Sequence, residues 1–237
     1  MPAANLLLST QAGLRGVMYV RFKPEASRLA MPDVCCDLVW VREKLYVSGP
    51  ATRGQPISWP GEEVTLLNID PLVARDWLGV PMKHLVDRRI ELRDIDATRA
   101  SPLEELFHAG MAGGLVDATL AHQSPSARIA TAAHAIRRGI SLESAASQVG
   151  LSGRQLERLF DDQLGISPRL YRRILRLRTA LQDIATGESL AGASAAAGYA
   201  DQAHFTRDVR TFMGTNPGNV ARRVGKVQDT LAYAREY

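Results

Sequence analysis

An internal repeat between residues 141 and 224 constrains the fold of this chain more than any other feature. Residues 141–173 recur, in degenerate form, as residues 189–222. Matching residues are 48 positions apart up to the glycine pair Gly150 and Gly198 and 49 apart beyond it, so the second copy contains one insertion. Two copies are too few to stack into a solenoid, and the repeat therefore predicts a tandem pair of small units.

Each unit has the pattern of a helix, a tight turn and a second helix. In the first unit, Ser141 is suited to cap a short helix that ends near Gly150, and Ser152 with Gln155 has the spacing of a capping box. Apolar residues of the second helix recur three and four positions apart and form one stripe. The predicted inward residues are Leu156, Leu159, Phe160 and Leu164, and the predicted outward residues are Arg154, Gln155, Glu157, Arg158 and Asp161.

The second unit repeats this arrangement, with Gly198 at the turn and Asp201 as the candidate cap. A small residue four positions before each turn glycine, Ala146 or Ser194, lets the two helices cross closely. This is helix-turn-helix geometry, in which the second helix enters the major groove of DNA. The predicted inward residues are Phe205, Val209 and Phe212 or Met213, and the predicted outward residues are Gln202, His204, Thr206, Arg207 and Arg210.

One long helix is predicted between the units. Ser167 and Pro168 begin it, and Gly187 ends it just after Thr186. Roughly 19 residues span about 28 Å at 1.5 Å per residue. Successive major-groove segments on one DNA face lie about 34 Å apart, so this helix can present both units to adjacent turns of a bent duplex. Its apolar seam, which faces both units, is Leu170, Ile174, Leu177, Leu181 and Ile184.

Residues Ala127 to Val224 resemble the C-terminal DNA-binding domain of the AraC/XylS family of bacterial transcription regulators. The resemblance rests on GLSGRQLERLFDDQLGISPRLYRRILRLRTA, on GYADQAHFTRDVRTFMGTNP and on the closing Arg222 and Arg223. It implies seven helices, two reading heads, binding to double-stranded promoter DNA and RNA polymerase as a partner. In the family, bases or phosphates are touched by the positions that match Arg154, Glu157, Arg158, Gln202, Ala203, His204, Thr206 and Arg207. With the adjoining Ser152, Gln155 and Arg210, these are the candidate DNA-binding residues.

The second unit departs from the family pattern before its turn. There the chain reads LAGASAAAG, with Gly192 inside the predicted helix and Ala193 and Ser194 at core positions. A glycine inside a helix costs about 1 kcal/mol relative to alanine. We therefore expect looser packing in the second unit.

The N-terminal half is predicted to be mostly strands. Short runs rich in valine, leucine and aromatic residues are bounded by turn residues and predict a small antiparallel sheet or partial barrel; they are GVMYVRFKP, VCCDLVWVRE, KLYVSGP and EVTLLNI. A helix is predicted to run to Gly79 and to restart after Pro81. Ser101 and Pro102 are expected to begin another, whose apolar face packs on its own domain or on a partner subunit. This face is Leu103, Leu106 and Phe107, with a break at Gly113 and Gly114.

These elements predict an α+β chain with two domains. The N-terminal half more weakly resembles a domain of an AraC-like subgroup; in the wider family such a domain is a cupin-like sensor or dimerisation module. The resemblance implies a small-molecule effector or a second copy as partner, without supplying the ligand. The predicted division is a sensor or dimerisation domain at 1–120, a linker at 121–126 in which Ser124 and Pro125 start the next helix, a DNA-binding domain at 127–224 and a tail at 225–237. Its helix-turn-helix units are 141–164 and 189–213, with the connecting helix at 167–186.

Charge is divided unevenly along this chain of formal net charge +4. Residues 1–124 hold 13 basic and 15 acidic residues, a net of −2, whereas residues 125–237 hold 16 and 10, a net of +6. Of those 16 basic residues, 15 are arginine, which suits bidentate contact with guanine and phosphate. The excess supports DNA binding, although a genome of high G+C content also enriches arginine. No segment resembles a signal peptide or a membrane span, so the expected location is the cytoplasm, at the nucleoid, without a membrane partner.

The two adjacent cysteines, Cys35 and Cys36, are compatible with a thiol sensor. Neighbouring strand residues point to opposite faces, so the commoner explanation is one buried and one near-surface structural cysteine. The histidines at 84, 108 and 122 have no ligand spacing with them, and neither a metal nor a cofactor is expected. The aromatic residues Tyr19, Trp40, Tyr46, Trp59 and Trp77 fit a sheet core better than a ligand pocket.

No catalytic motif of the GxSxG, phosphate-loop or HExxH type is present, and we do not expect an enzyme. One alternative is a thiol- or DNA-damage-responsive sensor or enzyme domain fused to a DNA-binding module, with Cys35 or Cys36 as the reactive residue. Another is an architectural DNA-binding protein without an effector. The operator, the effector and the sign of regulation do not follow from the sequence.

Overall fold

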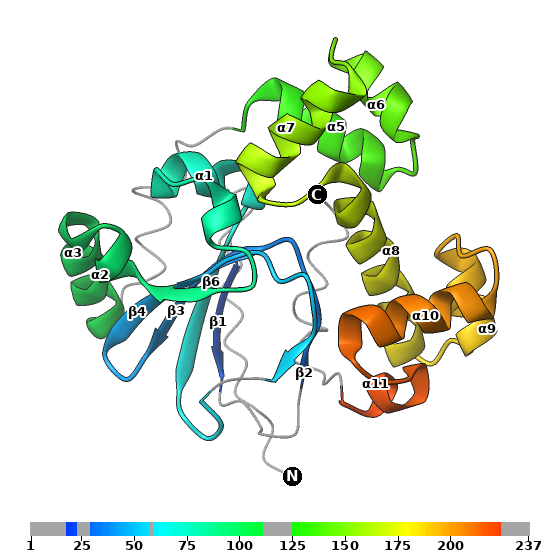
Figure 1. Ribbon diagram of the computed structural model, residues 1–237. Coiled ribbons are helices and arrows are strands. Elements are labelled where there is room, and N and C mark those ends of the chain that lie inside the picture. The colour runs from blue at the N-terminus through cyan, green and yellow to red at the C-terminus, as the bar shows by residue number, and fades with distance from the viewer. Residues whose placement is uncertain (1–17, 23–28, 57–58, 111–124, 224–237) are drawn as a thin grey trace.

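The computed structural model describes residues 18–22, 29–56, 59–110 and 125–223. Figure 1 shows an N-terminal part built on a β-sheet and a C-terminal part built of helices. We call residues 18–110 the sheet region and residues 125–223 the helical region. The predicted α+β class is confirmed.

Five strands form one antiparallel sheet in the order β1-β6-β3-β4-β7. Four of them are the strands predicted from the sequence, and the short β7 is added at one edge. A second sheet pairs β2 with β5. The bounds are β1 Met18–Phe22, β2 Leu29–Ala30, β3 Cys36–Val41, β4 Lys44–Ser48, β5 Gln55–Pro56, β6 Val64–Ile69 and β7 Arg89–Glu91.

The central strand β3 buries side chains on both of its faces. Cys36 and Leu38 belong to a core that also holds Trp77, whereas Val39 packs with Val64 on the opposite face. Alternation of side chains along the strand produces this division. The aromatic residues follow it, since Trp40 and Trp77 pack in the first core and Tyr46 and Trp59 in the second, as the core interpretation predicted. The side chain of Tyr19 lies outside the described ones.

Short helices cover the first of these faces. The first begins where Asp70 accepts a hydrogen bond from the amide of Leu72 at 2.8 Å, and it ends at Gly79, as predicted, with φ 72°. A single 3-10 turn follows after Pro81. The bounds are α1 Pro71–Leu78, η1 Met82–His84, α2 Leu92–Ile95 and α3 Ala97–His108.

The start predicted for α3 at Ser101 was wrong. The helix begins at Ala97, because the carboxylate of Asp96 accepts from the amide of Arg99 at 3.0 Å and provides a cap one turn earlier. Pro102 lies inside the helix, where its fixed φ is already helical. Leu103 and Phe107 are buried in the sheet-region core, so this helix packs on its own region, as expected. The expected break at Gly113 and Gly114 lies outside the described residues.

Seven helices follow between Ala127 and Arg223, in two copies of one helix-turn-helix unit with a long helix between them. We call α6 with α7 the first unit and α9 with α10 the second unit. The first helix starts at Ala127 after Ser126, which corrects the predicted start at Ser124 and Pro125; Ser124 lies outside the described residues. The bounds are α5 Ala127–Arg137, α6 Leu142–Gln148, α7 Gly153–Leu164, α8 Pro168–Ala185, α9 Leu190–Ala196, α10 Gln202–Met213 and α11 Pro217–Arg223.

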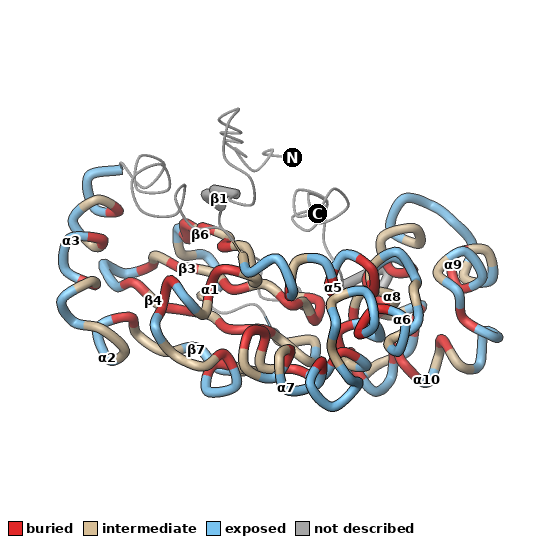
Figure 2. Tube along the Cα trace, turned by 90° about the horizontal axis from the view of Figure 1, so that it is seen from above, coloured by how far each residue is buried: buried red, intermediate tan, exposed pale blue. Residues whose placement is uncertain are grey.

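The long helix α8 joins the two units through one buried seam. Ser167 caps it and Pro168 is its first residue, as predicted, and it ends at Ala185, one residue before the predicted Thr186. Its inward positions pack against helices of both units (Figure 1). The predicted residues Ile174, Leu177 and Leu181 are buried, and Leu170 and Ile184 are partly buried. Figure 2 shows how buried positions on the helices face their neighbours while exposed positions face outward.

The sheet region contributes to the core of the helical region. Leu29, Met31 and Val34, which lie before β3, are buried in the same cluster as the apolar residues of α5 to α11. The two regions therefore share packed surface. Among the described residues, no helix combines the length and the apolar character that a membrane span requires.

Candidate nucleic-acid interface

The first unit owes its shape to caps on both of its helices. Ser141 accepts from the amide of Ser144 at 3.1 Å at the start of α6. At the start of α7, the amide of Gln155 donates to Ser152 Oγ at 3.3 Å, while the amide of Ser152 donates to Gln155 Oε1 at 2.8 Å. The predicted capping box is confirmed, and it fixes where α7 begins.

The exposed face of α7 carries the predicted polar side chains. Its inward residues Leu156, Phe160 and Leu164 are at most 1% exposed and Leu159 is partly buried, so the helix cannot rotate without exposing its core. The side chain of Gln155 is engaged in the cap, which leaves Arg154, Glu157 and Arg158 as the main polar candidates. The exposed residues are Ser152, Arg154, Gln155, Glu157, Arg158 and Asp161.

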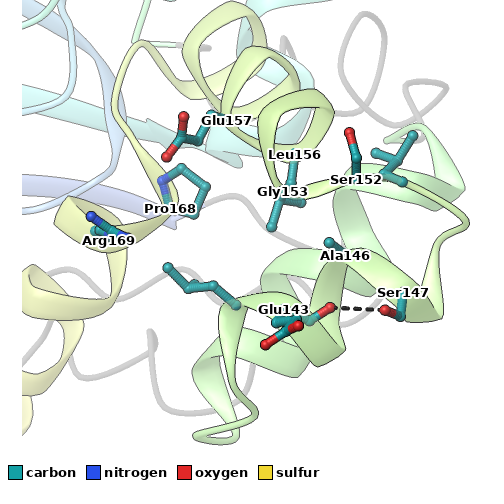
Figure 3. Close-up of a pocket in the computed structure, with 11 residues that line it drawn as sticks. Glu143, Ala146, Ser147, Ser152, Gly153, Leu156, Glu157, Pro168 and Arg169 are labelled. Carbon is teal, nitrogen blue, oxygen red and sulfur yellow. Dashed lines mark hydrogen bonds between the residues drawn. The ribbon is translucent and has the colours of Figure 1, made fainter.

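A pocket of about 490 Å³ opens where the N-terminal ends of α7 and α8 meet α6 (Figure 3). Ala146 and Leu156 are among its apolar lining, and Ser152 and Glu157 bring the exposed polar face of α7 to its edge. Ser147 Oγ donates to the carbonyl of Glu143 at 3.0 Å on its opposite side. The pocket is thus part of the same surface as the candidate residues of α7.

The second unit has equivalent caps, with a different residue at the start of its second helix. The amide of His204 donates to Asp201 Oδ1 at 2.6 Å, which confirms the predicted cap of α10. Gly192, which was expected to loosen α9, has a local role, because a Cβ at this position would collide with Glu188 Oε1. That oxygen accepts from the amide of Ser189 at 2.7 Å, so the glycine makes room for a second capping group.

The candidate residues of α10 divide into an exposed set and a half-buried pair. Phe205, Val209, Phe212 and Met213 are buried, which settles the inward face. His204 was expected to stand outward, but its ring is half-buried and packs edge-to-face on Tyr199, with centroids 5.2 Å apart. The exposed candidates are Gln202, Ala203, Arg207 and Arg210, and Thr206 is half-buried like His204.

A buried carboxylate fastens α10 to α8, and this group was not found by sequence reasoning. Asp208 is 3% exposed. It accepts from Arg173 at 2.8 Å, and from Arg176 and the Tyr199 hydroxyl at 3.3 Å each. Its position on the apolar side of α10, with arginines spaced three apart on α8, is the only signal the sequence contains.

Comparison with known proteins agrees with this geometry. Residues 145–223 match the family model described as a helix-turn-helix domain. A solved structure of a transcriptional regulator from Chromobacterium violaceum, one of the AraC-type DNA-binding domain-containing proteins, is 31% identical; the alignment covers 40% of this chain and 91% of that one, with a TM-score of 0.37. The chain belongs to the AraC/XylS family. It is a DNA-binding transcription regulator.

Two structures of ToxT from Vibrio cholerae are similar to this AraC-family chain over more of its length. An apo variant is 11% identical, covering 91% of this chain and 100% of that one, with a TM-score of 0.48. Wild-type ToxT bound to an unsaturated fatty acid is 13% identical, covering 91% and 98%, with a TM-score of 0.47. No functionally curated protein matches the sequence.

The two cysteines of this AraC-family regulator are free thiols in the sheet region. Cys36 is buried and Cys35 is half-buried, as the alternation of a strand predicted. Burial raises the pKa of the Cys35 thiol to about 12, and the neighbouring Asp33 and Asp37 act in the same direction. Reactive thiols need a lowered pKa, so this environment disfavours the thiol-sensor alternative. Among the described residues, no three histidine, cysteine or acidic side chains gather in a way that would hold a metal ion.

We expect Cys35 of the folded regulator to react with iodoacetamide on the order of a thousandfold more slowly at pH 8 than a free cysteine, because a pKa near 12 leaves almost no thiolate. Mass spectrometry over time gives the rate, and the same protein in urea is the control. Replacing both cysteines with serine should also leave any response of DNA binding to oxidant unchanged. Equal alkylation rates with and without urea would restore the sensor alternative.

Proposed function

We propose that this regulator binds promoter DNA with both units at once, and that each unit places its second helix in a major groove. The observation that carries the proposal is the repetition of one exposed polar face, on α7 and again on α10, with α8 packed against both units. The 18 residues of α8 span about 27 Å. With modest bending, this matches two groove segments about 34 Å apart on one face of the duplex.

Arginine supplies most of the proposed contacts. Phosphate contacts by the basic helical region give most of the affinity, and contacts to base edges give the sequence preference. Preference comes from the exposed polar side chains near the starts of the two reading helices, since these residues enter the groove first. The proposed contact residues are Ser152, Arg154, Gln155, Glu157 and Arg158 in the first unit, and Gln202, Ala203, His204, Thr206, Arg207 and Arg210 in the second.

We propose that residues 1–120 form a sensor or dimerisation domain, joined by a linker at 121–126 to the DNA-binding domain at 127–224. The described contacts give a signal a route to both units. Arg75 of α1 pairs with Asp162 of α7 at 3.2 Å. The amide of Gly54 donates at 2.6 Å to the carbonyl of Phe212, at the end of α10. A small-molecule effector or a second copy that shifts the sheet region would therefore move the two units relative to each other.

Contact with α8 strengthens this route. Arg178 lies on the connecting helix with its side chain 7% exposed, and its Nη1 is 3.5 Å from Asp33 Oδ2. Removing one partner of a buried ion pair usually costs several kcal/mol, so this pair ties the sheet region to the element that spaces the units.

In the cell we place the protein in the cytoplasm at the nucleoid, acting with RNA polymerase at promoters. The tail at 225–237 lies outside the described residues.

Selection from a random duplex library at physiological salt tests the proposal. We expect enrichment of sites with two preferred segments about one helical turn apart. Selection by the Arg154→Ala and Arg207→Ala variants should relax preference in one segment each. Sites with a single preferred segment, or no enrichment over random competitor, would contradict binding through both units.

Arg158→Ala is expected to weaken binding to a selected site by about 1 to 3 kcal/mol, because the exposed guanidinium is placed to contact a base or phosphate. Fluorescence anisotropy against specific and random duplexes measures the effect. Arg128→Ala is the matched control, since Arg128 is an exposed arginine on α5, which is neither of the two proposed reading helices. An unchanged affinity of the Arg158 variant for the selected duplex would remove this residue from the interface.

A further inference from the structure

The surroundings of His204 determine whether one of its ring nitrogens donates or accepts a hydrogen bond. His204 is the third residue of α10, and its Nε2 lies 3.3 Å from Nη2 of Arg176 on α8. A guanidinium has only donors, so Nε2 must accept. In a neutral imidazole the proton then belongs to Nδ1. No hydrogen bond among the described residues uses Nδ1, which leaves its N–H available as a donor.

Arg176 is itself held in place by two neighbours other than His204. The same Nη2 is 3.3 Å from Asp208 Oδ2, and Asp208 is almost completely buried. The guanidinium carbon lies 4.1 Å from the ring centroid of Tyr199, a favourable cation–π distance. Tyr199 also packs on the ring of His204, so the histidine and the arginine share one aromatic neighbour. The arginine is thereby fixed by contacts that do not depend on His204.

We propose that Arg176 is a positioning residue that holds His204 in the Nδ1–H tautomer, so that the second unit offers one fixed hydrogen-bond donor to an acceptor on the DNA. The inference rests on the proposed function and names what the second unit recognises. Suitable acceptors are a phosphate oxygen or a purine N7 in the major groove. The half-burial of His204 favours this role, because a packed ring loses little freedom when it binds.

The tautomer is tested without DNA. Nitrogen-15 NMR of the imidazole ring distinguishes a proton on Nδ1 from one on Nε2, and we expect Nδ1–H in the unmodified protein at pH 8. In Arg176→Met the ring should shift toward Nε2–H. Asp208→Asn is the second variant: it keeps the shape and an acceptor for Tyr199 while weakening the hold on Arg176, so the shift should be partial. A ring that carries its proton on Nε2 in the unmodified protein would overturn the proposal.

The donor is tested on a selected duplex. His204→Leu should lose about tenfold in affinity, the value of one hydrogen bond of about 1.4 kcal/mol. His204→Asn, which retains a donor near the position of Nδ1, should lose less than threefold. Arg176→Met should lose affinity too, and the double variant with His204→Leu should lose little more, because the two residues act through one contact. Equal binding by His204→Leu and the unmodified protein would contradict the donor role.

Modified duplexes distinguish the two sources of the acceptor. If a phosphate accepts, one methylphosphonate in the second segment will abolish the difference between the unmodified protein and His204→Leu. If a purine N7 accepts, one 7-deazapurine will do so. A difference that persists through every such substitution overturns the proposal. Failure of the unmodified protein to bind any duplex would instead contradict the proposed function. The NMR result does not depend on DNA binding, so the two failures are distinguishable.

Discussion

Phe160→Ala is expected to lower the free energy of unfolding by about 3 to 5 kcal/mol, the usual cost of removing a buried phenylalanine. Phe160 is 0% exposed, and its ring packs edge-to-face on Tyr171 of α8 with centroids 5.4 Å apart. Tyr171 in turn accepts a hydrogen bond from Arg137 of α5 at 3.2 Å. The Phe160 ring thus packs on the residue that links α8 to α5, and the cavity left by alanine cannot close without moving α7 or α8.

Two spectroscopic signals distinguish a loss of stability in the helical region from one in the sheet region. All three tryptophans, Trp40, Trp59 and Trp77, lie in the sheet region, so their fluorescence follows that region, while circular dichroism at 222 nm follows mainly the helical region. In urea, Phe160→Ala should shift the circular dichroism transition more than the fluorescence transition. The control Arg154→Ala, at an exposed position of the same helix, should change stability by less than about 0.5 kcal/mol. Similar midpoints for Phe160→Ala and the unmodified protein would contradict the core assigned to the first unit.

Gly165→Ala is expected to separate the first unit from the sheet region. Gly165 ends α7 at φ 69°, a conformation that disfavours any residue with a Cβ. A Cβ there would also lie 2.7 Å from the backbone of Met82 and Lys83 in η1. Because backbone atoms cannot rotate away, α7 and η1 must move apart. Overpacking of this kind costs about 1 to 3 kcal/mol beyond the strain of the left-handed backbone.

The repeat supplies the matched control for this substitution. Gly214 ends α10 in the second unit at φ 65°, but a Cβ at that position meets nothing within 4 Å. Gly214→Ala therefore adds the backbone strain without the collision. We expect Gly165→Ala to lose more stability in urea and to show faster hydrogen exchange in η1 and α7. Equal losses for the two variants would contradict the docking of the first unit on η1.

Local chemistry explains why most of the helical region could be predicted. The Ser152 and Gln155 box, the Asp201 cap and the left-handed Gly150 each depend on neighbours within a few residues, so the sequence contains all the information needed. The same holds for the apolar seam of α8, which needs only helical periodicity. Where a nearer cap competed, as Asp96 did with Ser101, the predicted start was several residues late.

Long-range contacts could not be read in the same way. Nothing local indicates that Met31 packs in the core of the helical region or that Gly54 donates to Phe212. His204 illustrates the point within the candidate interface, since helical periodicity placed it outward. Partners on α8 and at the turn draw its ring into a half-buried position. These features depend on how separate elements meet, which periodicity and capping do not determine.

Simultaneous binding by both units requires that α8 hold them at a fixed spacing. A selected duplex with five base pairs inserted between its two preferred segments tests this, because half a helical turn places the second segment on the opposite face of the DNA. We predict that the insertion lowers affinity to that of a duplex with one segment, by about a hundredfold or more. Unchanged affinity after the insertion would contradict simultaneous binding by both units along α8.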